Sequence, residues 1–263
     1  MGKITDALKK AAENRLARIE QRPQHSYVVE VDPQITKDFN IDPHVVAFSD
    51  PRSPVSEQYK ILRTNLMSLS SPAKPIKTIG ITSSIHNEGK TITSLNLAIT
   101  LAHDLAKKTI LILDADLRKS RVQKIMGIDT INAGLSEYLQ DSLALDNVLI
   151  KTGIQNLTLL PAGKSPKNPA ELLASYRMKE LLGTLKTHFD FVIIDMPPVI
   201  PVTDPGVIGA QIDGMILVIQ AGRTQRNIIA SAESLLSQAR VKLLGYIMTN
   251  VEYHMPEYLY RYM

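Results

Sequence analysis

The sequence predicts an α/β fold in which helices cover both faces of a doubly wound, mostly parallel sheet. Short, continuously apolar runs, typical of strands that are buried on both faces, alternate with stretches of helical periodicity. The predicted strands are 77–82, 109–113, 157–160, 191–194, 215–219 and 243–248. The predicted helices of the domain are 55–69, 89–106, 169–187, 203–211 and 224–240.

The chain before residue 55 divides into two parts. Residues 3–20 place apolar side chains at three- to four-residue spacing among lysines and arginines, which predicts an amphipathic helix. We expect it to dock on the domain or on a partner, with a membrane surface as the second possibility. Residues 21–54 contain five prolines and little periodicity, which is typical of a linker. The expected organisation is therefore 1–54 as helix and linker, 55–250 as the domain and 251–263 as a tail.

The helix expected after the first strand carries its apolar residues on one side. Leu95, Leu97, Ala98 and Leu101 recur at the spacing of a face that packs on the sheet. The next run, 109–113, contains no charged residue, and the later strand runs repeat its texture. Strand and helix thus alternate to the end of the domain, as in a sheet built from right-handed crossovers.

Composition excludes several classes of function. Of the 263 residues 44% are hydrophobic and 21% charged, which is ordinary for a globular protein. The absence of cysteine excludes disulfides, thiolate zinc sites and thiol catalysis. A net charge of +4, without a basic run among aromatic residues, argues against nucleic acid as a partner. The apolar runs are far shorter than the ~18 residues of a membrane span, and the N-terminus lacks a signal-peptide pattern, so we expect a cytoplasmic location.

The segment between the first strand and its helix predicts a phosphate-binding loop. Such a loop aims backbone N–H groups at phosphates, and the following helix adds its positive end. Lys90 would neutralise phosphate charge and the Thr91 hydroxyl would bind Mg²⁺. Asn87 occupies a position where glycine is common, but asparagine tolerates left-handed dihedral angles. The expected phosphate-contacting residues are Ser84, His86, Asn87, Glu88, Gly89, Lys90 and Thr91, with the His86 side chain facing solvent.

Three aspartates follow apolar strands in the same sheet. Asp114, Asp116 and Asp195 each lie at the carboxyl end of a predicted strand, where ligands bind in open α/β sheets. Carboxylate, hydroxyl and phosphate oxygens are the ligands that Mg²⁺ prefers. With the loop they predict a site for ATP and Mg²⁺ of the P-loop NTPase type. Its catalytic groups would be Lys90 and the three aspartates, and its metal ligands Thr91 and the same aspartates.

Three motifs resemble those of the bacterial tyrosine kinase family over about residues 50–263. They are the loop Thr82–Thr91, a second Walker motif at Ile110–Arg118 and a Walker B motif at Phe191–Pro198. The resemblance implies a tyrosine autokinase of exopolysaccharide and capsule assembly. It implies Asp114 as the base, Asp116 and Asp195 around the metal, and Arg118 near the phosphates. By analogy Asn250 would contact adenine, although a turn-forming asparagine explains it equally well.

The end of the chain is rich in tyrosine. Four of the nine tyrosines fall within the last eleven residues, among histidine, proline, glutamate and arginine. This pattern predicts an exposed tail whose Tyr253, Tyr258, Tyr260 and Tyr262 accept phosphate, and a stacking or docking tail is the alternative. Thirteen residues can span up to ~40 Å, enough to reach a neighbouring active site.

Glu57, Lys60 and Arg63 resemble a helix that the family uses for ring assembly. Their spacing places the three charges on one helical side, although Lys60 replaces an arginine and a solvated charged face explains the pattern as well. The resemblance further implies copies of the chain, a membrane-embedded activator of polysaccharide assembly and a tyrosine phosphatase as partners. It places the chain at the inner face of the membrane, held there through a partner.

Two alternatives remain at this point. Septum-site and chromosome-partition ATPases share the sheet, and they use ATP as a switch to position partner proteins without phosphorylating tyrosine. They carry a lysine where this chain has Ile85. A catalytically impaired relative is the other alternative, motivated by Asn87 and Lys60.

Overall fold

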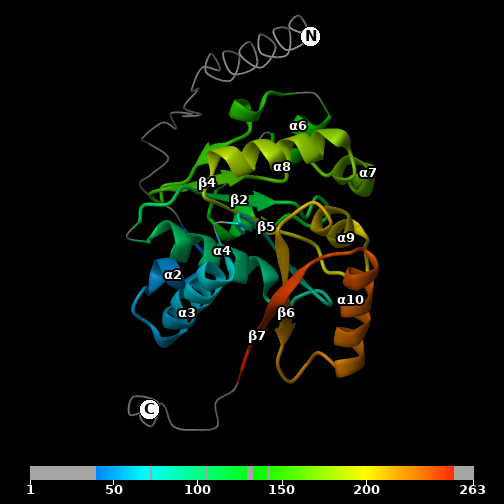
Figure 1. Cartoon of the computed structure of the whole chain (residues 1–263). Helices are drawn as coiled ribbons and strands as arrows, with labels where there is room; N and C mark the ends of the chain where they lie inside the picture. Colours follow the sequence, from blue (N-terminus) through cyan, green and yellow to red (C-terminus); the bar gives the residue numbers. More distant parts are fainter. Residues whose placement is uncertain (1–39, 72, 105, 129–132, 141–142, 252–263) are drawn as a thin grey trace, which may run out of the picture.

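The computed structural model describes residues 40–251, apart from residues 72, 105, 129–132 and 141–142. Within this part a seven-stranded sheet has the order β3-β4-β2-β5-β1-β6-β7 (Figure 1). The strands are β1 (Thr78–Ser83), β2 (Ile110–Asp114), β3 (Ile150–Lys151), β4 (Leu157–Leu160), β5 (Phe191–Asp195), β6 (Gly214–Gln220) and β7 (Leu243–Thr249). The six predicted strands are parallel, and the short β3, which the sequence analysis missed, runs antiparallel to β4. The predicted fold class is confirmed.

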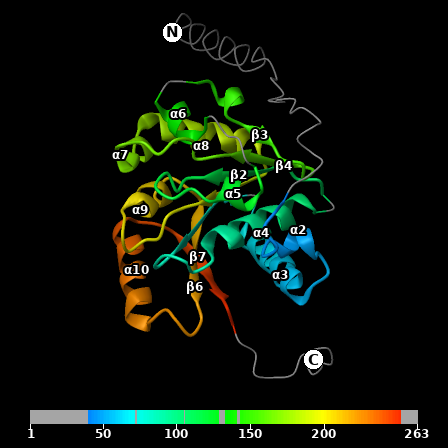
Figure 2. The ribbon, with the colours of Figure 1, turned by 180° about the vertical axis from the view of Figure 1, so that it is seen from behind.

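Helices cover both faces of the sheet, as Figures 1 and 2 show from opposite sides. One face carries α2 (Val46–Ser49), α3 (Pro54–Leu69), α4 (Lys90–Ala102) and α5 (Val122–Ile125). The other carries α6 (Leu135–Leu139), α7 (Pro169–Leu173), α8 (Tyr176–His188), α9 (Asp204–Gly209) and α10 (Arg226–Gln238), with a 3₁₀ turn η2 at Leu145–Asn147. In the described part of the chain, every helix is too short or too polar to span a lipid bilayer.

The core lies on both sides of the central strands. In β2, Leu111 and Leu113 pack into one apolar cluster, and Ile110 and Ile112 pack into the other. All four side chains are fully buried, because successive residues of a strand point to opposite faces. This two-sided burial explains why the strand sequences are continuously apolar rather than alternating.

The predicted linker differs from the structure in its last part. Val45 and Ala47 are buried, and the Ala47 N–H donates to Asn96 Oδ1 of α4 at 2.8 Å. The Asn96 amide in turn donates to the His44 carbonyl at 3.1 Å. Residues 42–50 therefore belong to the packed domain, which begins before residue 55. The predicted helix at 3–20 and the linker up to residue 39 lie outside the described residues.

Two predicted helices have different bounds in the structure. The stretch 169–187 forms two helices, because the Ser175 hydroxyl accepts the Met178 N–H at 3.2 Å and starts α8 afresh. The helix after the phosphate loop ends at Ala102, four residues before its predicted end. Both differences lie away from the loop and leave its position unchanged.

Candidate functional site

The loop between β1 and α4 has the backbone that its sequence predicts. Asn87 has φ 62° and Gly89 has φ 90°, so both residues are left-handed. A Cβ atom on Gly89 would lie 3.3 Å from Thr249 Cγ2, so space as well as φ favours glycine there. Gly89 leads directly into α4, whose first N–H groups have no partner within the helix. The loop thus presents N–H groups and a positive helix end to an anion.

Lys90 brings this loop to the ends of two strands. Its Nζ lies 3.0 Å from Asp116 Oδ2 and 3.4 Å from Asp195 Oδ2. The Thr91 hydroxyl donates to Asp195 Oδ2 at 2.8 Å. Because β2 and β5 are neighbours, Asp114 lies beside Asp195 in the strand register. The structure therefore assembles the predicted lysine, threonine and three aspartates in one place.

The aspartates carry more negative charge than Lys90 can balance. Asp114 and Asp195 are both fully buried, and burial followed by the charge of Asp195 raises the pKa of Asp114 to about 7. Burial also raises the pKa of Asp195, although Lys90 and the Thr91 hydroxyl oppose this. For Lys90, burial lowers the pKa, but Asp195 and Asp116 outweigh it, and the pKa rises above its ordinary value. Lys90 is therefore charged at neutral pH, and a further cation would relieve the excess of negative charge.

The geometry fits Mg²⁺ held together with phosphate rather than by protein alone. Within the described residues, histidine and carboxylate side chains nowhere form a group of three that could enclose a metal ion. Mg²⁺ bound next to phosphates commonly takes one or two carboxylates and completes its shell with phosphate and water. Thr91 and Asp195, already 2.8 Å apart, are the pair that best matches this requirement.

Asp114 is engaged on both carboxylate oxygens. Its Oδ2 accepts the Ser120 hydroxyl at 2.7 Å and the Val122 N–H at 3.3 Å. Its Oδ1 accepts the Asp116 N–H at 3.1 Å. Of these three donors the Ser120 hydroxyl has the most freedom to turn away, because the other two are backbone N–H groups.

Two residues predicted to contact phosphate use their side chains elsewhere. Glu88 is 1% exposed, and its carboxylate accepts the Ile85 N–H at 2.8 Å, so only its own N–H remains for a phosphate. Arg118 donates from Nε and Nη2 to the two oxygens of Asp204, at 2.8 and 3.1 Å. Asp204 is fully buried at the start of α9, and it anchors the guanidinium on that helix. Its hydrogen bond raises the pKa of Arg118, and the charge of Asp116 beside the loop lysine also raises it. Glu88 can still offer its backbone N–H to a phosphate, and a phosphate contact of Arg118 stays a prediction.

The remaining loop predictions divide into buried and exposed positions. His86 is exposed, which agrees with the expected solvent-facing side chain. Ser84 is buried, and within the described part of the chain its hydroxyl has no hydrogen-bond partner. Asn250 is exposed with φ 52°, directly after β7. It lies near the loop, because the preceding Thr249 donates from Oγ1 to the Glu88 carbonyl at 2.8 Å. The four tail tyrosines lie outside the described residues.

The charged side of α3 is less uniform than its spacing predicts. Lys60 Nζ lies 2.6 Å from Glu57 Oε1, and both side chains are exposed. Arg63 instead donates from Nη1 to the Thr100 carbonyl near the end of α4, at 3.1 Å. Two of the three predicted interface charges thus pair with each other, and the third holds the C-terminal turn of α4.

Sequence reasoning missed two hydroxyls of the site. The Ser94 hydroxyl donates to Asp195 Oδ1 at 3.0 Å, and the Ser120 hydroxyl donates to Asp114. Ser94 lies one helical turn after Lys90 and Thr91, so helical periodicity could have placed it beside them. Ser120 lies in a turn after β2, and its direction is visible only in the folded chain.

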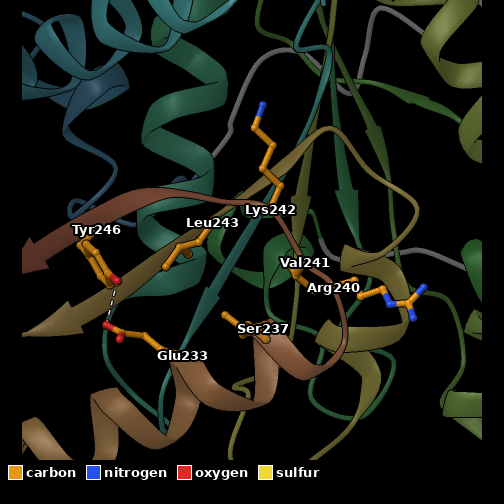
Figure 3. Close-up of a pocket in the computed structure, with 8 residues that line it drawn as sticks. Glu233, Ser237, Arg240, Val241, Lys242, Leu243 and Tyr246 are labelled. Carbon is orange, nitrogen blue, oxygen red and sulfur yellow. Dashed lines mark hydrogen bonds between the residues drawn. The ribbon is translucent and has the colours of Figure 1, made fainter.

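A separate groove of about 470 Å³ lies between α10 and β7 (Figure 3). The Tyr246 hydroxyl donates to Glu233 Oε1 at 2.7 Å, and Lys242 points away from this pair. The groove is also lined by Leu236, Ser237, Arg240, Val241 and Leu243. None of the residues predicted for the nucleotide site lines this groove.

Comparisons with known proteins agree with this geometry. The AAA domain family matches residues 76–242. The tyrosine-protein kinase YwqD of Bacillus subtilis is 37% identical over 205 residues, which cover 78% of this chain and 85% of that protein. The kinase domain of the Escherichia coli tyrosine kinase ETK superposes with a TM-score of 0.77 at 29% identity, over 84% of this chain and 85% of the other.

The class that shares the sheet but not the kinase motifs is more distant. The cell division ATPase MinD of Pyrococcus furiosus has a TM-score of 0.57 at 21% identity, over 69% of this chain and 76% of the other. This likeness shows the P-loop fold alone. The nucleotide-switch alternative is therefore not favoured.

Proposed function

The chain belongs to the bacterial tyrosine kinase family, and we propose that it transfers the γ-phosphate of ATP to tyrosines in the C-terminal tails of neighbouring copies. The observation that carries the proposal is the meeting of Lys90, Thr91, Asp114, Asp116 and Asp195 at the end of a phosphate loop. Phosphoryl transfer needs mainly positioning and neutralisation of charge, and this group of residues supplies both.

The phosphate loop binds and orients the triphosphate. Its N–H groups and the start of α4 hold the phosphate oxygens, and the Lys90 ammonium offsets charge at the γ-phosphate. Mg²⁺, held by Thr91 and Asp195, would supply further positive charge beside the phosphates. Asp116 holds Lys90 at 3.0 Å and so keeps the ammonium at the mouth of the loop.

Asp114 takes the proton of the tyrosine hydroxyl. A pKa of about 7 suits a general base at neutral pH, because the group is partly ionised and still basic enough to accept a proton. The Ser120 hydroxyl, now 2.7 Å from Oδ2, occupies the position that the tyrosine hydroxyl would take.

The acceptors are Tyr253, Tyr258, Tyr260 and Tyr262. The tail begins at the carboxyl edge of the sheet, where β7 ends beside the phosphate loop. Self-association through α3, with Glu57 and Lys60 exposed on it, would bring one tail to the site of the next copy. Asn250, beside the loop, contacts adenine in this proposal.

The cellular setting of the proposal follows from the family. A membrane-embedded activator chain recruits the kinase to the inner face of the membrane, and a tyrosine phosphatase reverses the reaction. The cycle between phosphorylated and unphosphorylated copies then regulates exopolysaccharide synthesis and export. Nucleic acid has no part in it, in keeping with the balanced charge of the chain.

Mass spectrometry of the tail tests the function. The purified chain is incubated with ATP and Mg²⁺, with and without the cytoplasmic segment of an activator. Phosphate on the tail tyrosines is the expected result, and its loss when all four are replaced by phenylalanine would identify the acceptors. ATP turnover without any tyrosine phosphate, with the activator present, would refute the proposal.

A further inference from the structure

Glu88 connects the phosphate loop to two other parts of the chain. Its carboxylate accepts three neutral donors: the Ile85 N–H within the loop, the Gln220 N–H at 3.3 Å and the Thr224 hydroxyl. Gln220 and Thr224 flank the turn between β6 and α10. The Glu88 carbonyl accepts the Thr249 hydroxyl at the end of β7.

A second contact joins the same turn to the loop. Arg223 donates from Nη1 to the Asn87 carbonyl at 3.0 Å and to Gln220 Oε1 at 2.9 Å. The turn between β6 and α10 thus holds the loop through its backbone at Asn87 as well as through the Glu88 side chain. Glu88 lies between the two left-handed residues of the loop, Asn87 and Gly89, and its side chain is buried.

The chemistry of this contact requires a carboxylate. A buried charge is unfavourable unless it is well hydrogen-bonded, and no lysine or arginine forms an ion pair with Glu88 within the described residues. Two of its three donors are backbone N–H groups, which cannot reverse their direction. A glutamine would aim its NH₂ group at one of these donors, whereas both oxygens of a carboxylate accept.

We propose that Glu88 is a positioning residue, which holds the N–H groups of the phosphate loop in their binding geometry by fastening the loop to the turn between β6 and α10. The inference rests on the proposed function only in that the loop binds nucleotide. A loop held in advance loses less freedom on binding, so the effect of Glu88 falls on nucleotide affinity.

Glu137 provides a matched control. Its carboxylate also accepts two backbone N–H groups and one hydroxyl, from Gly134 at 2.7 Å, Lys164 at 3.1 Å and Ser136 at 3.0 Å. These contacts fasten the start of α6 to the chain after β4, outside the nucleotide site. Glu88→Gln and Glu137→Gln therefore remove similar hydrogen bonds at two places.

The experiment measures the Kd of the full chain for Mg²⁺-ATP and Mg²⁺-ADP, together with unfolding by urea. Glu88→Gln is expected to weaken both nucleotides about tenfold, and Thr224→Val about threefold. The double variant should bind no more weakly than Glu88→Gln, because both changes break the same connection. Glu137→Gln should lose stability and keep its Kd within twofold.

Unchanged nucleotide affinity in Glu88→Gln, with a loss of stability like that of Glu137→Gln, would overturn the proposal. If Glu88→Gln does not fold, Thr224→Val decides alone, and an unchanged Kd in that variant counts against the inference. Binding is measured without phosphate transfer. Normal nucleotide binding by the original chain, without tail phosphorylation when the activator segment is present, would therefore refute the kinase reaction and leave the test of Glu88 readable.

Discussion

Aspartates lie at both edges of the sheet, and their partners and the direction of their pKa shifts differ between the two edges. At the edge where the strands begin, Asp213 Oδ2 accepts the Lys77 N–H, the Thr78 N–H and the Thr78 hydroxyl, each at 2.9 Å. Its Oδ1 accepts Lys186 Nζ at 2.7 Å. Burial acts to raise the pKa of Asp213, but these bonds together hold it below its ordinary value.

At the edge where the strands end, Asp114 and Asp195 lie side by side with raised pKa values. Donors meet the carboxylates at both edges, but Asp213 has a lysine of its own, whereas three carboxylates share Lys90 at the other edge. Asp213 therefore stabilises the fold, whereas Asp114 and Asp195 are placed to bind a cation or a proton.

The largest test of this contrast exchanges the lysine of each edge for methionine. Lys90→Met should lower tail phosphorylation about 1000-fold, because the developing phosphate charge loses its closest cation. Lys186→Met removes the partner of Asp213 and should leave phosphorylation within twofold. Quantitative phosphotyrosine analysis measures both rates. Equal losses would mean that the two edges do not differ in function.

The second test exchanges one aspartate of each edge for asparagine. Asp114→Asn should lower phosphorylation about 100-fold through loss of the base. It should change stability little, since relief of repulsion from Asp195 offsets a weakened hydrogen bond. Asp213→Asn should lower the free energy of unfolding by about 1–2 kcal/mol with normal phosphorylation. Urea unfolding measures the stability of both variants, and initial rates of tail phosphorylation measure their activity. A normal rate in Asp114→Asn would exclude Asp114 as the base.

The third test is pH. The folded pKa of Asp114, about 7, exceeds the 3.8 of the unfolded chain, so the folded state binds more protons between these values. The free energy of unfolding should therefore fall as pH rises from about 4 to 7 without metal. The shift of Asp114 corresponds to about 4 kcal/mol, and the raised pKa of Asp195 acts in the same direction.

Asp213 has the opposite sign. Its folded pKa is lowered, so its contribution to stability is present above the unfolded pKa and is lost as pH falls through the folded value. Urea unfolding of the metal-free chain between pH 3 and 8 would reveal both trends. Asp114→Asn should reduce the fall toward pH 7 and leave the part due to Asp195, and Mg²⁺ with nucleotide should reduce it further; a fall of unchanged size in the variant would contradict the assignment to Asp114.

The smallest test concerns two left-handed asparagines, one at each edge. Asn87 has φ 62° in the phosphate loop, and Asn156 has φ 63° just before β4. Replacement by alanine should lower the free energy of unfolding by about 1 kcal/mol at either site, and replacement by glycine should be nearly neutral. Only Asn87→Ala should weaken nucleotide binding, a few-fold in a Kd measurement. A similar loss in Asn156→Ala would show that the effect is one of general stability.

The sequence predicted the parallel strands well, because a strand that is buried on both faces leaves an unbroken apolar run. It also predicted Lys90, Thr91 and the three aspartates, because parallel strands bring their carboxyl ends to one edge. The side-chain partners of Glu88 and Arg118 were not predicted. Motif spacing does not say where a side chain points, and the partner of Arg118 is 86 residues later in the chain. The packing of residues 42–50 was missed because this short stretch shows no helical periodicity, whereas the buried Val45 and the bonds to Asn96 hold it through contacts distant in sequence.

Helix α4 joins two places that the proposed function uses. It begins at Lys90 in the phosphate loop and ends where Arg63 of α3 holds its last turn, about 20 Å away along the helix axis. The nucleotide would therefore bind at one end of this helix, while α3, the helix proposed to contact neighbouring copies, is fastened to its other end. Thermodynamic reciprocity then sets a firm condition. If ATP changes the self-association constant of the chain by some factor, self-association must change the affinity for ATP by the same factor.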